Sequence, residues 1–91
     1  MKKQILIKRK TNVVAREIGN TITILNPKSG VIYSLNDTAS CIWKFLYKKR
    51  SLPEITDRLC SAFNIVESVA RKDALKFIED CITNRLITKV S

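Results

Sequence analysis

The sequence contains no histidine, and only two glycines and two prolines occur among its 91 residues. Histidine is the side chain whose ordinary pKa lies closest to neutral pH, so its absence removes the usual general base. The two glycines, Gly19 and Gly30, are isolated and form no phosphate-binding loop. Asp73 with Asp80 or Glu79, the nearest carboxylates at helical spacing, fits a solvated helix surface better than a catalytic pair. We therefore expect a protein that is not an enzyme and uses no cofactor.

The three cysteines are too few and too scattered for a disulfide framework or a metal site. Cys41, Cys60 and Cys81 are an odd number, no Cys-x-x-Cys pair occurs, and no histidine can complete a zinc site. Each cysteine lies in or beside an apolar helical stripe, where a thiol behaves as a small hydrophobic group. We expect buried or half-buried inert thiols, with a reactive or modified cysteine as the alternative.

Long hydrophobic runs are missing as well. The longest, such as residues 5–7 and 22–25, are far too short to cross a bilayer. The first three residues have the charge of a signal-peptide start. However, the apolar stretch after them ends at the basic residues 8–10, and no small-residue cleavage site follows. The sequence predicts a cytoplasmic protein without a membrane partner.

Basic residues are abundant, since 17 lysines and arginines stand against eight acidic side chains and the net charge is +9. A charge of this size makes nucleic acid a candidate partner. The basic residues are nevertheless spread over the whole length, at residues 2–3, 8–10, 48–50 and 71–72, and do not gather on one element. Such scatter is typical of a solvated surface, so nucleic-acid binding is kept only as the alternative.

The pattern of the chain changes near residue 36, where strand signals give way to helix signals. Length and composition fit one domain over residues 1–91, with residues 1–10 as a flexible or edge-strand arm. The strands should form a small antiparallel meander, because turn residues at 19–20 and 26–30 separate them. The expected strands span residues 5–7, 13–18, 21–25 and 31–35, with a short closing strand over 86–90.

Three helices are expected after residue 36. A capping box runs from Ser51 to Glu54 with a proline in the first turn, and it is a specific start signal for the second helix. The expected helices begin at residue 36 or 37, at residue 52, and at residue 64 or 68; the first and third end near residues 47 and 85. Strands followed by helices predict an α+β, winged-helix-like fold: a three-stranded antiparallel N-terminal sheet, then three helices covering one of its faces.

Apolar residues recur at intervals of three and four along each expected helix and predict its buried face. The stripes are Ala39, Ile42, Trp43 and Leu46; Leu52, Ile55, Leu59 and Phe63; and Ala70, Ala74, Phe77, Ile78 and Cys81. Trp43 could instead be a stacking platform for bases, but its place in a stripe favours the core. Tyr33 fits hairpin packing and groove lining equally well.

Several motifs follow one another in a distinctive order: Gly19, residues 22–25, Gly30, residues 33–36, Thr38-Ala39, Ile42-Trp43, Glu54-Ile55, Leu59, Asp73 and Phe77-Ile78. Their order and spacing resemble the PqqD family over about residues 12–88. The run from Gly30 to Trp43 is the most specific part. One departure is that a glycine usually lies near the end of the third helix, where this chain has Asn84-Arg85-Leu86-Ile87. Asparagine can also adopt the left-handed cap, so the match is little weakened.

The resemblance implies a RiPP recognition element, a non-catalytic domain that binds the leader region of a ribosomally synthesised precursor peptide. In that family the leader adds a strand to the edge of the third strand and lies in a groove beside the third helix. Strand addition suits an exposed edge, whose free amide and carbonyl groups can bind any extended peptide. Carried over by position, the peptide-binding residues are Val31, Ile32, Tyr33, Ser34 and Leu35 on the strand, and Val69, Lys72, Asp73, Lys76, Phe77 and Asp80 on the helix.

The resemblance also implies an enzyme partner, either a radical enzyme of pyrroloquinoline quinone biosynthesis or a leader peptidase and cyclase of lasso-peptide biosynthesis. Trp43 and the single-domain length are closer to the lasso-type carrier. A second surface for the enzyme is expected at Lys44, Lys48, Lys49 and Arg50. An open strand edge permits a strand-exchanged dimer as well as a monomer. The alternative function is that of a winged-helix DNA-binding protein. Its second helix, however, has little beyond Arg58 that could contact a DNA groove.

Overall fold

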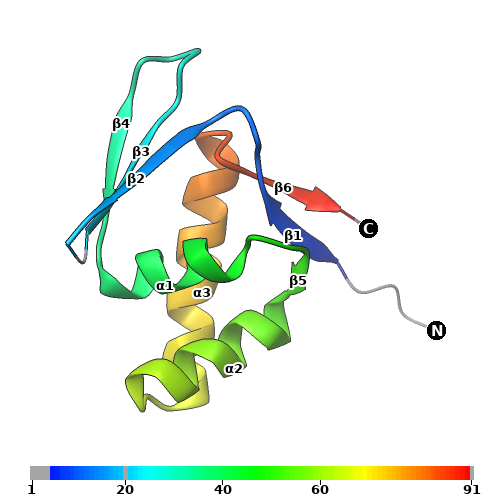
Figure 1. Cartoon of the computed structure of the whole chain (residues 1–91). Helices are drawn as coiled ribbons and strands as arrows, with labels where there is room; N and C mark the ends of the chain where they lie inside the picture. The colour runs from blue at the N-terminus through cyan, green and yellow to red at the C-terminus, as the bar shows by residue number, and fades with distance from the viewer. Residues whose placement is uncertain (1–4, 20, 91) are drawn as a thin grey trace.

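The computed structural model describes residues 5–19 and 21–90, and this part of the chain contains three helices and six strands. The strands form two antiparallel sheets of three strands each. Figure 1 shows the helices packed together beside both sheets, with α3 running behind α1 toward them. The predicted α+β, winged-helix-like class is confirmed, and the second sheet is an addition to it. Within residues 5–19 and 21–90, none of the helices combines the length and apolar character that a membrane span requires.

The first sheet is the predicted meander, with strand order β2-β3-β4. Its strands are β2 (Val14–Ile18), β3 (Thr21–Leu25) and β4 (Ile32–Leu35). The β3–β4 turn is held by the Asn26 N–H, which donates to the Val31 carbonyl at 3.1 Å, and by the Gly30 N–H, which donates to the Asn26 carbonyl at 2.8 Å. Gly30 has a φ of 72°, a conformation that side chains with a Cβ rarely adopt. The predicted reversal at residues 19–20 lies partly outside the described residues.

One face of this sheet is buried and the other is exposed. Ile22 and Ile24 of β3 are buried, and they lie directly opposite Leu35 and Tyr33 of β4. Both β4 residues are half-buried and pack against the core. On the other face, Ile32 is 64% exposed and Val14 is 51% exposed, so this side of the sheet turns apolar groups toward solvent. The two-residue alternation along β3 is therefore what orients the sheet on the helices.

The second sheet has the strand order β5-β1-β6 and joins the two ends of the described chain. Its strands are β1 (Leu6–Arg9), β5 (Arg50–Ser51) and β6 (Ile87–Val90). The expectation of a flexible or edge-strand arm over residues 1–10 is wrong for residues 6–9, because β1 pairs on both sides and is the central strand. The closing strand is confirmed. A local sequence pattern cannot reveal the partners of β1, because β5 lies more than 40 residues further along the chain.

The helix starts confirm one prediction and correct another. The helices are α1 (Asp37–Phe45), α2 (Leu52–Phe63) and α3 (Glu67–Thr83). Asn36 caps α1 through its side chain, and Ser51 with Glu54 forms the predicted capping box of α2. Of the two predicted starts of α3, Ser68 is one residue late and Asn64 is wrong. Asn64 instead ends α2 in a left-handed conformation with a φ of 52°, and α3 follows Val66, whose side chain cannot accept a capping hydrogen bond.

The hydrophobic core lies where the three helices meet the inner face of the first sheet and the central strand of the second. Its buried apolar members are Ile7, Ile22, Ile24, Ile42, Trp43, Leu46, Ile55, Leu59, Ala70, Ala74, Ile78, Cys81, Leu86 and Ile87. Trp43 is buried as predicted. Phe63 is the exception to the predicted stripes, because it is 38% exposed at the last position of α2. A helix end projects past its neighbours, so periodicity alone overestimates burial there.

Candidate functional site

Strand β4 forms one border of its sheet. Among residues 5–19 and 21–90 it pairs with β3 and with no other strand. Hydrogen-bonded and non-hydrogen-bonded pairs alternate along an antiparallel ladder. Because Asn26 donates to Val31, the next hydrogen-bonded pairs in this register are Tyr33 with Ile24 and Leu35 with Ile22. The backbone N–H and C=O groups of Ile32 and Ser34 therefore point away from β3, toward the open border.

A groove of about 650 Å³ lies between this border and α3. The start of α1 closes one side of it. The groove is lined by Ile32, Tyr33, Ser34, Leu35, Asn36, Thr38, Ala39, Ile42, Asp73, Lys76, Phe77, Asp80, Cys81, Asn84 and Leu86. Strand border and groove thus lie side by side, which is the arrangement that an added extended segment requires.

Two hydrogen bonds hold β4 at a fixed place relative to the helices. The Ser40 hydroxyl of α1 donates to the Leu35 carbonyl at 3.4 Å, at the end of β4. At the other end, the Asn26 side-chain amide donates to the Asn84 carbonyl at 3.3 Å and ties the β3–β4 turn to the end of α3. Ser40 and Asn26 are both buried, so solvent competes little for these bonds. The width of the groove is therefore set by the fold itself.

The groove has an apolar floor and a charged rim. Ile42 and Leu86 are buried in the floor, and Phe77 is half-buried beside them. Asp73 and Asp80 are exposed and stand on the α3 side of the groove. Such a surface offers apolar contact below and charge above, while the free β4 groups supply directional hydrogen bonds.

Most of the predicted peptide-binding residues meet in this groove. From the strand these are Ile32, Tyr33, Ser34 and Leu35, and from the helix Asp73, Lys76, Phe77 and Asp80. Val31, Val69 and Lys72 do not line it. Val31 borders a separate hollow at the β3–β4 turn, and Val69 is exposed one turn before the groove begins. Tyr33 serves both of the roles considered for it, since it packs against the core and lines the groove.

Sequence reasoning missed the contribution of α1 and of the end of α3. Asn36, Thr38 and Ala39 line the groove because the first turn of α1 follows β4 directly. Cys81 and Asn84 continue the helical face on which Asp73, Phe77 and Asp80 lie, at spacings of three and four residues. That periodicity was available in the sequence and would have identified both residues.

The thiol at the groove wall, that of Cys81, is a poor nucleophile. Cys81 is buried, and burial, followed by the nearby Asp80 charge, raises the pKa of the Cys81 thiol to about 12. A thiol with such a pKa carries almost no thiolate at neutral pH, so it is a poor nucleophile. No cluster of three metal-ligating side chains occurs in the part of the chain that the structure describes.

The other flank of α1 borders a second hollow of about 440 Å³. It is lined by Asp37, Ser40, Cys41, Lys44, Phe45, Tyr47, Arg58 and Phe63. Tyr47 is 60% exposed, and its ring lies 5.6 Å from the Lys48 ammonium. Lys44 also pairs with Glu17 of β2 at 2.6 Å. The hollow is therefore mainly basic and aromatic, whereas the rim of the groove carries two acidic residues and one basic residue.

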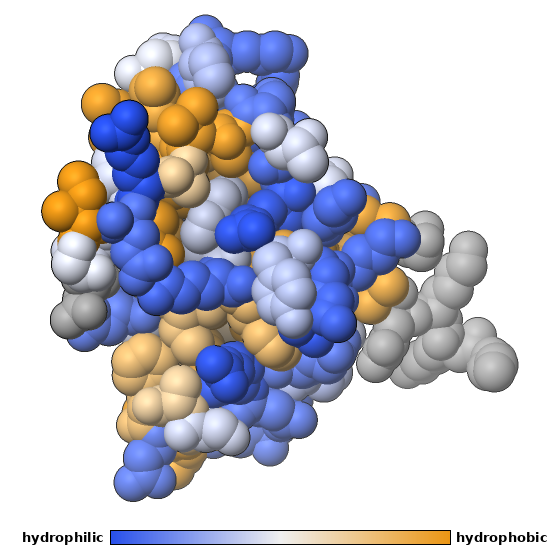
Figure 2. All heavy atoms as spheres, viewed as in Figure 1, coloured by the Kyte–Doolittle hydropathy of each residue, from blue (hydrophilic) through white to orange (hydrophobic). Residues whose placement is uncertain are grey.

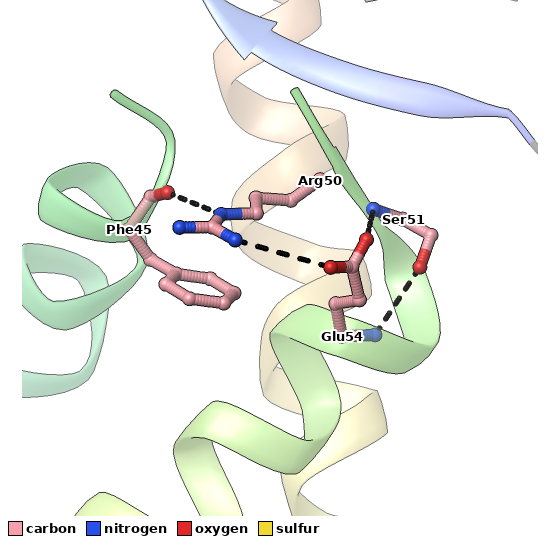
Figure 3. A network of polar contacts seen from close by, with 4 residues as sticks. All are labelled: Phe45, Arg50, Ser51 and Glu54. Atoms are coloured by element: carbon pink, nitrogen blue, oxygen red, sulfur yellow. Dashed lines mark hydrogen bonds and ion pairs between the residues drawn. The ribbon is translucent and has the colours of Figure 1, made fainter. Parts of the chain in front are cut away.

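Arg50 belongs to the packing between α1 and α2 more than to the surface (Figure 3). Its Nε donates to the Phe45 carbonyl at 3.0 Å, and its guanidinium carbon lies 3.9 Å from the centre of the Phe45 ring. Glu54 lies 3.9 Å away on the other side and accepts a hydrogen bond from the Ser51 N–H at 2.9 Å. Only 15% of the Arg50 side chain is exposed. Of the four basic residues predicted to contact an enzyme, Arg50 is thus the least accessible.

Apolar side chains also reach the surface of the first sheet. Figure 2 shows an apolar area over this sheet, crossed by hydrophilic side chains, and a second, paler apolar area over the helices below it. Val14, Leu25 and Ile32 form a cross-strand row there, since Val14 pairs with Leu25 and Leu25 pairs with Ile32. The row ends at Ile32, on the open border of β4.

Comparison with known proteins gives one family and two structures. A family model described as coenzyme PQQ synthesis protein D (PqqD) matches residues 21–87. A structure of TbiB1 in complex with the TbiA(beta) leader peptide matches with a TM-score of 0.80 and 22% identity, over 88% of this chain and 93% of that one. A structure of lasso peptide synthetase B1 complexed with the leader peptide matches with a TM-score of 0.78 and 20% identity, over 90% and 96%. No curated protein sequence matches.

Proposed function

The chain belongs to the PqqD family, and on that premise we propose that it binds the leader region of a ribosomally made precursor peptide by strand addition to β4. The observation that carries the proposal is the open β4 border beside the groove. The two proteins of similar fold were each solved with a leader peptide, which supports the same class of ligand. The protein would hold the leader so that a separate enzyme can act on the precursor.

Binding by strand addition explains how affinity and selectivity are divided. The backbone groups of Ile32 and Ser34 would exchange hydrogen bonds with the peptide backbone, which contributes affinity regardless of peptide sequence. Alternate peptide side chains then point to opposite sides of the extended sheet. One set enters the groove over Phe77 and Ile42, and the other continues the exposed row that ends at Ile32. Selectivity comes from these two sets of contacts.

The same groove is poorly equipped for catalysis. The chain contains no histidine, and the one groove thiol is held in its protonated form. The groove carboxylates Asp73 and Asp80 are exposed on a helix surface, where a carboxyl group lacks the burial that makes it a good general acid. We infer that the protein presents the peptide and leaves bond making and breaking to its partner.

The test is titration of the purified protein with the leader of a precursor encoded near its gene. Fluorescence anisotropy or calorimetry should show saturable binding at micromolar concentration or tighter. Absence of saturation for every adjacent precursor would refute the proposal.

A second titration tests strand addition directly. A set of leader peptides is made, each methylated at one backbone nitrogen. Only every second residue of an added strand donates its N–H to β4, so methylation should weaken binding with a period of two residues. A uniform effect along the peptide, or none, would mean that the peptide binds in another conformation.

We also propose that the processing enzyme contacts the second hollow, which Lys44 and Tyr47 line, together with Lys48 and Lys49, which follow Tyr47 in the chain. The hollow and the groove lie on different flanks of α1, so a peptide and an enzyme can occupy them at the same time. A triple variant with Lys44, Lys48 and Lys49 replaced by Gln should bind the leader like the wild type but slow processing in a reconstituted reaction. Unchanged processing would show that the enzyme docks elsewhere. Arg50 is left intact because its replacement would disturb the α1–α2 packing.

A further inference from the structure

The groove differs in charge from the rest of the protein, and this difference bears on which peptides it accepts. The chain has 17 basic and eight acidic side chains. Two of the eight acidic ones, Asp73 and Asp80, lie together on the α3 side of the groove. A protein with a net charge of +9 would be expected to repel a basic peptide, yet this groove is net acidic, because two carboxylates line it against one lysine, Lys76.

Within residues 5–19 and 21–90, neither of these two carboxylates forms an ion pair. The ion pairs among the described residues are Glu17 with Lys44, Glu54 with Arg50, and Glu67 with Arg71. Lys76 lies three residues after Asp73 and four before Asp80, at spacings that allow ion pairs on a helix, but it forms neither within 4.0 Å. The charges of Asp73 and Asp80 therefore remain available to a ligand.

Asp80 also lies where a helix disfavours a carboxylate. Helix α3 ends at Thr83 and has no basic residue in its last turn. The negative end of the helix dipole lies in that turn, so a carboxylate there is destabilising and a neutral or basic residue would be favourable. The helix itself thus gains nothing from Asp80. An unfavourable charge at a groove wall is typical of a residue whose role is in binding.

The spacing of the two carboxylates suits an extended ligand. Seven residues of helix separate them, a rise of about 10 Å. Same-side residues of a strand recur about every 7 Å, and a lysine or arginine side chain spans the remaining difference. Each carboxylate can therefore be reached by a different groove-facing residue of the peptide, with an apolar residue above Phe77 as its neighbour.

We propose that Asp73 and Asp80 determine specificity, and that the groove selects an extended peptide carrying an apolar anchor and at least one lysine or arginine on its groove-facing side. The inference rests on the proposed function, because it concerns the ligand of the same groove. Partly exposed charge pairs contribute modestly, so loss of one carboxylate should weaken binding about three- to tenfold. Reversal of both charges should weaken it more.

The experiment uses three synthetic peptides and three proteins. The peptides are the leader encoded beside the gene, a copy with its lysines and arginines replaced by Gln, and a copy with them replaced by Glu. The proteins are the wild type, Asp73→Lys with Asp80→Lys, and Glu79→Lys. Glu79 is the matched control, since it neighbours Asp80 on the same helix and is also exposed, but does not line the groove. Circular dichroism and thermal unfolding verify that each variant is folded.

The wild type should bind the unmodified leader best, the doubly reversed variant should prefer the Glu copy, and Glu79→Lys should behave like the wild type. Equal wild-type binding of the leader and the Gln copy would overturn the inference and leave the proposed function intact. Equal losses in Glu79→Lys and the doubly reversed variant would also overturn it, because the effect would then be long-range. If no peptide binds the wild type, the proposed function fails and the inference fails with it.

A stability measurement adds an independent readout. Asp80→Asn should raise the midpoint of thermal unfolding slightly, because it removes a carboxylate from the negative end of α3, while it lowers affinity for the unmodified leader. A residue with a merely structural role would lose stability and affinity together, and that result would count against the assignment.

Discussion

Single residues with unusual backbone conformations mark the helix ends of this protein. Arg85 has a φ of 59° directly after α3, while Asn84 has a φ of −91°. The prediction that Asn84 takes the left-handed position is therefore wrong by one residue. Arg85 occupies the place where the PqqD resemblance led us to expect glycine. A residue with a Cβ pays a steric cost there, since the left-handed conformation brings the Cβ close to the backbone.

Arg85→Gly should stabilise the protein. The relief of left-handed strain outweighs the greater freedom of glycine in the unfolded chain, and we expect a gain of about 0.5 to 1 kcal/mol in the free energy of unfolding. Urea denaturation measures it. Gly30→Ala is the opposite control, because Gly30 has a φ of 72° and no atom lies within 4 Å of an added Cβ. Its expected loss of about 1 kcal/mol would come from the backbone alone. A stability loss in Arg85→Gly would contradict the strain argument.

Glu54 should contribute to the pH dependence of stability. The Ser51 backbone N–H, and then the Ser51 side chain, hold the pKa of Glu54 below its ordinary value. A carboxyl group with a lowered pKa in the folded state stabilises at pH values above its unfolded pKa. That stabilisation is lost as the pH falls through the folded pKa. Wild-type protein should thus lose more stability between about pH 7 and about pH 3 than Glu54→Gln. Parallel urea titrations at both pH values give the comparison, and equal losses would exclude a role for this carboxylate.

At the scale of elements, the two borders of the first sheet differ in their surroundings. The outer border of β4 faces the groove, while the outer border of β2 runs past a smaller hollow of about 330 Å³ near Trp43. The register places the free backbone groups of β4 at Ile32 and Ser34. By the same alternation, those of β2 are at Ala15 and Glu17. Each border therefore offers a position where proline removes an outward N–H without breaking the ladder to β3.

Ile32→Pro should abolish leader binding while the protein stays folded, because proline deletes an N–H that the added strand requires. Ala15→Pro makes the same chemical change on the opposite border and should leave binding unchanged. Affinity is measured by fluorescence anisotropy, with circular dichroism as the folding control. Retained binding in folded Ile32→Pro, or an equal loss in Ala15→Pro, would mean that β4 is not the augmented strand.

At the scale of the whole molecule, the groove is framed by β4, α1 and α3, so a ligand in it ties these elements together. Helix α1 is otherwise in limited contact with α3 and with β4, whereas α2 packs closely against α3. A bound peptide should therefore stabilise the entire fold, since it binds the native state alone.

Leader binding should raise the midpoint of thermal unfolding in proportion to the logarithm of the peptide concentration. At about 100 times the dissociation constant the gain is about 2.7 kcal/mol, which corresponds to roughly 10 to 20 °C for a domain of this size. Differential scanning fluorimetry tests it. Duplex DNA, the ligand of the alternative function, should give no such shift at about 0.15 M salt, where screening weakens contacts between scattered charges. A larger shift with DNA than with the leader would favour the alternative.

The meander, the two side-chain-capped helix starts and most of the core could be predicted from the amino-acid sequence. All of these depend on signals within a few residues: alternation in β3, the Ser51 to Glu54 capping box, and the apolar spacing that buries Trp43. The family resemblance, and not a local signal, predicted that residues of β4 and α3 form a binding site. Local signals failed at the start of α3, where no side chain caps the helix, and at Phe63, where the helix ends beyond its neighbours.

How distant segments meet is a property of the folded chain alone. The pairing of β1 with β5 joins residues more than 40 positions apart, and its pairing with β6 joins residues 78 to 84 positions apart. Nothing in a strand of four residues specifies such partners. The groove likewise exists because Asn26 holds Asn84 and Ser40 holds Leu35, which sets the distance between β4 and α3. The residue types in the groove could be read from the chain. Packing decides that these residues face one another across the groove, with Asp73 and Asp80 above an apolar floor.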